Sequence, residues 1–143
     1  MAVAAAVVLV VIVSAIRIHP YQLAYFNSFA GGPAAGPQLL DDSNIDWGQD
    51  LPGLAEWQAE HSGQPLALDY FGTDDPTAYG IDSRPISEDE LFQPGRTVYA
   101  LSVNSLIRLK LSAQTNSRAE LDWLARYTPT ARIGYSIYVY DFR

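Results

Sequence analysis

Residues 133–142 read IGYSIYVYDF and carry the strongest strand signal in the chain, because apolar or aromatic side chains fall on both faces of the segment. A strand of this kind belongs in the middle of a sheet that is covered on both sides. Three other segments also fit strands: 38–40, 65–71 and 97–102. The sequence therefore predicts a sheet with residues 133–142 in its interior.

Helices are expected between these strands. Three segments fit them: 51–60, 106–111 and 118–127, the last with Ser117 as its N-cap. A single helical turn is expected at residues 76–79. Strands that alternate with helices are typical of an α/β domain. We therefore predict a small α/β domain over residues 37–143, with helices flanking a largely parallel sheet.

The composition excludes several classes of protein. The chain has 143 residues, enough for one domain with a buried core, and its formal net charge of −7 argues against a nucleic-acid binder. There is no cysteine, which excludes disulfides, thiolate metal sites and a cysteine nucleophile. Charged residues make up only 17% of the chain, which directs attention to a membrane segment.

The N-terminal segment 2–16 reads AVAAAVVLVVIVSAI and has no charge. As a helix it spans about 22 Å, less than the roughly 30 Å of a hydrocarbon core. A signal peptide is not favoured, because no basic region precedes the segment and no small-residue cleavage site follows it. A buried core helix is not favoured either, since the segment is apolar on every face. We expect residues 1–18 to be the C-terminal part of a transmembrane helix.

The next segment, 19–36, is expected to form an aromatic helix that begins at Pro20, followed by a Gly/Pro linker. Four aromatic residues recur in it at helical spacing: Tyr21, Tyr25, Phe26 and Phe29. Such residues are typical of the membrane interface, but the same spacing also suits a helix packed on the domain. The acidic domain that follows is expected outside the cytoplasm by the positive-inside rule, although Arg17 weighs the other way.

The densest polar segment is 41–50, DDSNIDWGQD. The candidate binding residues are Asp42, Asn44, Asp46, Trp47 and Gln49. Alternating oxygen ligands resemble the start of a calcium loop, but the bidentate glutamate that such a loop needs is absent, so no metal is expected. Helix capping remains one interpretation of this segment. The other is sugar binding, in which carboxylates and amides bind hydroxyl groups and the indole stacks on the ring.

The start of the first helix can be read in two ways. Asp46 and Gln49 have the spacing of a capping box. That start places Pro52 inside the second turn, where it is unfavourable. Asp50 as the N-cap removes this conflict, and we therefore expect the helix to begin after Asp50.

Three segments together resemble a known family: HPYQLAYFNSFAGG (19–32), DDSNIDWGQDL (41–51) and ARIGYSIYVYDF (131–142), with DYFGTDDPTAYGI (69–81) between them. They are similar to the C-terminal, extracytoplasmic region of bacterial polytopic glycosyltransferases that use a lipid-phosphate sugar donor, the family 39-like, protein-mannosyltransferase-like membrane enzymes. The resemblance covers residues 17–143, and its most specific part is Ser43 to Leu51. Pro52-Gly53 departs from the family's pattern.

The resemblance implies a role in sugar transfer at the cell membrane. In that family the catalytic acid lies far upstream, so it implies no catalytic residue in this chain. The partners implied are the lipid bilayer, an upstream transmembrane region of the same enzyme and a glycan or protein acceptor. The only cofactor-like molecule implied is the lipid-phosphate-linked sugar donor of the full enzyme.

We therefore expect a domain that covers the active site of such an enzyme or contacts its acceptor or sugar. One alternative is a free-standing, membrane-anchored module that binds glycans or proteins. A second is a small secreted hydrolase, which needs a close pair of carboxylates. The two histidines, His19 and His61, support neither a catalytic triad nor a metal site.

Overall fold

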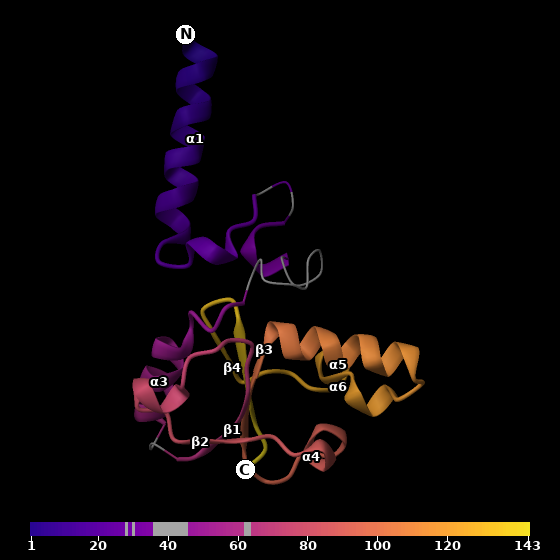
Figure 1. Ribbon diagram of the computed structural model, residues 1–143. Coiled ribbons are helices and arrows are strands. Elements are labelled where there is room, and N and C mark those ends of the chain that lie inside the picture. The colour runs from indigo at the N-terminus through magenta and orange to yellow at the C-terminus, as the bar shows by residue number, and fades with distance from the viewer. Residues whose placement is uncertain (28, 30, 36–45, 62–63) are drawn as a thin grey trace.

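The computed structural model describes residues 1–27, 29, 31–35, 46–61 and 64–143 (Figure 1). The fold is a five-stranded sheet with helices on both faces and one helix that projects from it. The helices are α1 (Ala2–Ile18), α3 (Leu51–Glu60), α4 (Glu88–Phe92), α5 (Val103–Thr115) and α6 (Trp123–Arg126). Short 3-10 turns lie at η1 (Gln22–Ala24), η3 (Pro33–Ala35), η4 (Pro76–Tyr79) and η5 (Ala119–Leu121). The strands are β1 (Leu66–Asp69), β2 (Ser83–Pro85), β3 (Val98–Ser102), β4 (Ala131–Ile133) and β5 (Ile137–Asp141). The predicted α/β class is confirmed.

The prediction of a largely parallel sheet is wrong. The strand order is β2-β1-β3-β5-β4, in which β1 pairs in parallel with β2 and β3, whereas β5 pairs antiparallel with β3 and β4. The cause lies in the segment 133–142, which was expected to be one strand. A three-residue turn at 134–136 breaks it into the hairpin β4–β5, with Ile133 opposite Ile137. Gly134 and Ser136 lie in this turn, but the apolar and aromatic residues around them led to the prediction of one continuous strand. As predicted, β5 lies inside the sheet.

Two hydrophobic cores follow from the alternation of side chains along the strands. On one face, Leu54 of α3 packs against Leu68, Ala100 and Val139. On the other face, the helices α5 and α6 cover Tyr99, Leu101 and Tyr140, with the fully buried Trp123 in the middle of an aromatic cluster. The sheet is therefore covered on both sides, and its ends remain as the places where polar groups can meet.

Local signals located one helix and one helical turn correctly. The helix α3 runs from Leu51 to Glu60 as predicted, with Asp50 at the N-cap and Pro52 in the first turn. Gly53 belongs there because a Cβ would come 2.8 Å from Ile133 Cγ2 of β4. The turn at 76–79 is also confirmed.

Two predicted helices differ from the structure. The helix expected at 106–111 is longer, because Ser102 caps it at the end of β3 and accepts a hydrogen bond from the Ser105 N–H. The helix expected at 118–127 is replaced by the 3-10 turn η5 and the short α6, whose cap is Asp122. Ser117, the expected cap, has a φ of 54° instead.

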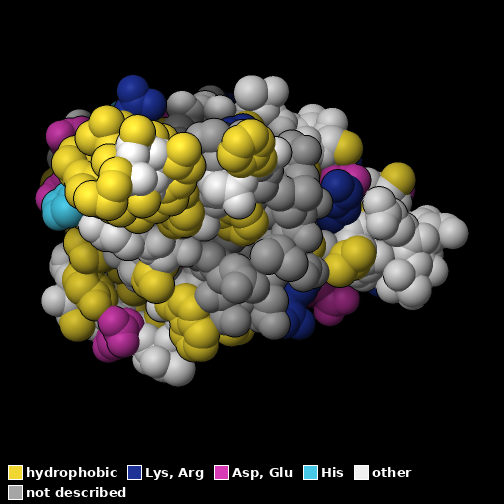
Figure 2. All heavy atoms as spheres, turned by 90° about the horizontal axis from the view of Figure 1, so that it is seen from above, with side chains coloured by type: hydrophobic (Ala, Val, Ile, Leu, Met, Phe, Trp, Pro, Cys, Tyr) yellow, Lys and Arg dark blue, Asp and Glu magenta, His cyan; other side chains and the backbone are white. Residues whose placement is uncertain are grey.

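The helix α1 is apolar all round and almost wholly exposed, with only Ile18 buried. It projects away from the sheet in Figure 1, and Figure 2 looks down on this end and shows hydrophobic side chains gathered over it. Over the described ranges, no helix combines the length and the apolar character required to cross a membrane.

Among the described residues after residue 19, the expected aromatic helix does not form, and the 3-10 turn η1 lies at its start. Without it, the aromatic residues do not share a helical face. Tyr25 and Phe29 are exposed, Phe26 is half-buried, and Tyr21 packs edge-on against Tyr135 of the hairpin turn with ring centres 5.4 Å apart. The sequence left open whether these aromatic residues contact the bilayer or the domain. Tyr21 contacts the domain. The strand expected at 38–40 lies outside the described residues.

Candidate functional site

The topology places one crevice at the carboxyl ends of β1 and β3. The chain leaves β1 toward β2 on one side, and it leaves β3 through α5 toward β4 and β5 on the other side. Where neighbouring parallel strands continue in opposite directions, their connections separate and leave room for a ligand. Asp69 ends β1 and Ser102 ends β3, so both lie at this point.

Ser102 ties the two strand ends together. Its hydroxyl oxygen accepts hydrogen bonds from the Phe71 N–H at 3.2 Å and from the Ser105 N–H at 3.3 Å. One bond holds the chain just after β1, and the other caps α5. The side chain is fully buried, so this junction is rigidly built.

Asp46 reaches the same junction from the segment before α3, and it is 1% exposed. Its Oδ1 accepts a hydrogen bond from the Gly48 N–H at 3.1 Å, whereas its Oδ2 is buried and makes no hydrogen bond of ordinary geometry. Burial raises the pKa of Asp46, and the nearby Ser102 hydroxyl and the backbone N–H groups of Gly48 and Asn104 oppose the rise. The Asp46 carboxyl is thus enclosed by polar groups of the two strand ends.

Trp47 is presented to solvent next to Asp46. Its side chain is 57% exposed, and its indole lies 6.0 Å from the Phe71 ring at an angle of 58°. The Gln49 side-chain oxygen accepts a hydrogen bond from the Trp47 N–H at 2.7 Å and so holds the turn. Gly72 allows the close packing beneath, because a Cβ there would come 2.5 Å from the Tyr70 ring. An exposed indole fixed in this way can stack on an apolar ring face.

A cavity of about 340 Å³ adjoins this turn. Its lining residues come from the end of β1 and the first turns of α5: Asp69, Tyr70, Phe71, Asn104, Ser105, Arg108 and Leu109. Burial raises the pKa of Asp69, while the Ser105 hydroxyl favours its ionised form. Phe71 lines the cavity and also packs on Trp47, so the cavity and the exposed indole form one continuous surface.

Asp50, in contrast, is a structural residue. Its Oδ2 accepts three hydrogen bonds from the hairpin turn: from the Tyr135 N–H at 3.1 Å, the Ser136 N–H at 3.0 Å and the Ser136 hydroxyl at 2.8 Å. Gly134 is required there, since its φ is +55° and a Cβ would clash with the Asp50 carboxylate. The acidic segment is thus divided between a turn at the crevice, which contains Asp46, and a clamp at Asp50.

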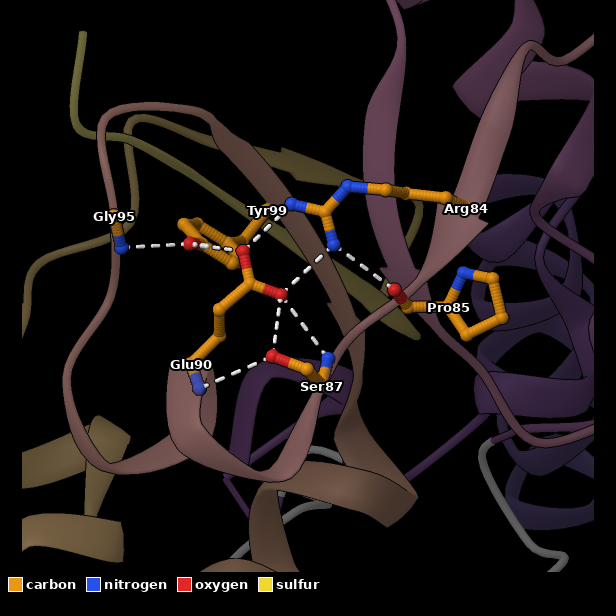
Figure 3. A network of polar contacts seen from close by, with 6 residues as sticks. All are labelled: Arg84, Pro85, Ser87, Glu90, Gly95 and Tyr99. Carbon is orange, nitrogen blue, oxygen red and sulfur yellow. Dashed lines mark hydrogen bonds and ion pairs between the residues drawn. The ribbon is translucent and has the colours of Figure 1, made fainter.

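A second polar network, shown in Figure 3, is also structural. The Arg84 guanidinium donates to both Glu90 carboxylate oxygens at 2.6 and 2.8 Å, and the Tyr99 hydroxyl donates to the same carboxylate at 3.0 Å. These bonds lower the pKa of Glu90, with Arg84 as the main cause. Its polar groups bind one another and join β2, α4 and β3, so the network holds these three elements together.

Of the residues predicted from the sequence, the structure brings Asp46, Trp47 and Gln49 into one turn at the crevice. Asp42 and Asn44 lie outside the described residues. Sequence reasoning missed four residues that line the cavity: Asp69, Asn104, Ser105 and Arg108. The signal for Asp69 was its place at the end of a predicted strand, and Ser105 follows the capping Ser102 by three residues.

In the part of the chain that the structure describes, no three His, Cys, Asp or Glu side chains gather closely enough to hold an ion. Comparison with known proteins found no family model, no curated protein and no solved structure that matches this chain.

Proposed function

We propose that this chain is the membrane-tethered, saccharide-binding part of a lipid-carrier-dependent glycosyltransferase, acting on the extracytoplasmic side of the cell membrane. The proposal rests on one observation above all: an exposed, braced Trp47 lies beside a buried Asp46 and a cavity at the carboxyl ends of β1 and β3. The chain binds sugar or acceptor and supplies no catalytic group. The resemblance of residues 17–143 to such enzymes supports the same conclusion.

The crevice has the chemistry that a sugar requires. A pyranose ring has an apolar face that packs on an indole, and its hydroxyls donate to carboxylate oxygens. Trp47 supplies the face, and Asp69, which is half-buried and lines the cavity, supplies an acceptor, with Asp46 buried behind the turn that carries Trp47. Phe71 contacts the Trp47 ring and lines the same cavity as Asp69, so it connects the aromatic group with an acidic one.

The N-terminal segment supports attachment to a bilayer. Every described side chain of α1 before Ile18 faces out except the half-buried Ser14, and Arg17 at its end is the first charged side chain in the sequence. Tyr25 and Phe29, both exposed, follow the helix as interfacial residues do. In this proposal α1 is the C-terminal part of a membrane span that packs against upstream helices of the same enzyme, and the lipid-phosphate-linked sugar is bound by the whole enzyme.

The test measures sugar binding by the full chain in lipid nanodiscs, using intrinsic tryptophan fluorescence and calorimetry with a panel of monosaccharides. Trp47→Ala should weaken binding at least tenfold without changing the melting temperature, because the indole is exposed. The matched control is Trp57→Ala on α3, whose ring stacks on His61 away from the crevice. Equal effects of the two substitutions, or no binding of any sugar, would refute the proposal.

A second measurement separates the enzyme from a free-standing binding module. The DNA upstream of the Met1 codon is sequenced in the source genome. An open frame that encodes many apolar segments supports the transferase. An in-frame stop with a ribosome-binding site supports the module instead.

A further inference from the structure

Arg108 occupies an unusual place in the cavity. It lies in the second turn of α5, it is exposed, and its Nε donates to the Asn104 side-chain oxygen at 2.8 Å. Asn104 is 3% exposed and therefore cannot move freely. The buried Asn104 thus orients the Arg108 guanidinium through Nε, and Arg108 also lines the cavity.

The terminal nitrogens of Arg108 have no hydrogen bond or ion pair with any residue in the described segments. Three other arginines of the domain have partners for their guanidinium groups. Arg84 pairs with Glu90 and Arg143 pairs with Asp141, each at 2.6 Å, and Arg132 lies over the Tyr138 ring at 4.6 Å. The buried Asn104 amide therefore orients the Arg108 guanidinium. The two terminal nitrogens of this guanidinium remain available to a ligand.

The geometry favours a carboxylate as the group that Arg108 binds. A guanidinium offers two parallel N–H donors, which match the two oxygens of a carboxylate. A dianion such as a phosphate monoester suits the site less well, since Arg108 is the one cationic side chain among the cavity residues, Asp69 lies in the same lining, and the whole chain carries a net charge of −7. A singly charged group is the better match.

We propose that the cavity selects an acidic saccharide, with the sugar carboxylate on Arg108 and the ring against Phe71 toward Trp47. This inference rests on the proposed function and names the substrate class of the same site. The volume of about 340 Å³ lies in the range of small-molecule sites and accommodates one monosaccharide unit. Arg108 is then a specificity-determining residue.

The test compares four ligands on the full chain in nanodiscs: D-glucuronate, its neutral methyl ester, D-glucose and D-glucose 6-phosphate. Glucuronate should bind about tenfold more tightly than its methyl ester at low salt, a factor that corresponds to about 1.4 kcal/mol. Salt at 0.5 M should reduce this preference, because the site is open to solvent.

Arg108→Gln should abolish the preference for glucuronate while binding of the methyl ester stays within twofold. The matched control is Lys110→Gln, which removes the same charge from an exposed position of the same helix outside the cavity lining and should leave the preference intact. An unchanged melting temperature of both variants shows that the fold is kept.

Other outcomes overturn the inference in distinguishable ways. If glucuronate and its methyl ester bind equally through Trp47, the proposed function stands and the acidic selectivity is refuted. If glucose 6-phosphate binds more tightly than glucuronate in an Arg108-dependent manner, the carboxylate assignment is refuted in favour of phosphate. If none of these ligands and no sugar of the wider panel binds, the proposed function fails together with the inference.

Discussion

Replacement of Asp50 by alanine tests the role assigned to the clamp between α3 and the β4–β5 hairpin. Asp50 is 4% exposed, and its Oδ2 accepts bonds from the Tyr135 N–H, the Ser136 N–H and the Ser136 hydroxyl. Alanine leaves all three donors without their partner, and Ser136 is fully buried. Each unsatisfied buried donor costs about 1–3 kcal/mol, and since Tyr135 is half-buried we expect a total loss of roughly 4 kcal/mol.

The assay is urea denaturation of the full chain in detergent micelles, followed by tryptophan fluorescence. With a slope of about 2 kcal/mol per molar urea, Asp50→Ala should lower the midpoint by about 2 M. Asp50→Asn keeps one acceptor oxygen and should lower it by about half as much. Glu56→Ala serves as the control, because it removes an exposed carboxylate from the same helix and should change stability by less than about 0.5 kcal/mol. If Asp50→Ala shifts the midpoint no more than Glu56→Ala, the clamp contributes nothing and the reasoning is wrong.

Three further predictions use the same denaturation assay. Gly134→Ala should cost about 2 kcal/mol or more, because the added Cβ meets the Asp50 carboxylate at a φ of +55°, whereas Gly80→Ala, at a φ of +80° in open space, should cost only about 1 kcal/mol. The pKa of Glu90 is lowered in the folded state, so this residue stabilises the fold above its unfolded pKa and loses the effect as pH falls; the drop in urea midpoint below about pH 4.5 should be smaller in Glu90→Gln. Burial raises the pKa of Asp46, so its ionisation destabilises the folded state at neutral pH; Asp46→Asn should therefore raise the midpoint at pH 7.5, and the gain should shrink at pH 4. A lower midpoint for Asp46→Asn at pH 7.5 would contradict the assignment of Asp46 as a binding residue held at a cost in stability.

Sequence reasoning succeeded wherever the signal lies within a few neighbouring residues. An earlier start would place Pro52 inside the second turn of α3, so the sequence predicts a start after Asp50. The structure confirms this start. The strands β1 and β3 were located to within two residues at each end, since short apolar runs with bounding turn residues mark them well. Asp46, Trp47 and Gln49, predicted as binding residues, share one turn because they are adjacent in the chain; their binding stays a prediction.

The errors have a common physical origin in contacts that are distant in sequence. The hairpin turn at 134–136 is held by Asp50, 85 and 86 residues away, and its local signals, Gly134 and Ser136, are outweighed by the apolar and aromatic residues on both sides. The helix expected after Ser117 gave way to η5 and α6, where Trp123 is drawn into the aromatic core and donates from its indole nitrogen to the Leu91 carbonyl at 2.7 Å. In both places tertiary packing overrode local preference.

The sequence by itself determined that this is an acidic α/β domain behind an apolar N-terminal helix, because composition, periodicity and capping are local properties of the chain. Only the tertiary structure decided the mixed strand order and, with it, the content of the site. The order β2-β1-β3-β5-β4 brings Asp69 from one strand next to Ser105 and Arg108 from a helix that follows another. It also divides the acidic segment, since Asp46 lies at the crevice while Asp50, four residues later, is buried in the hairpin turn by bonds that only the folded chain can form.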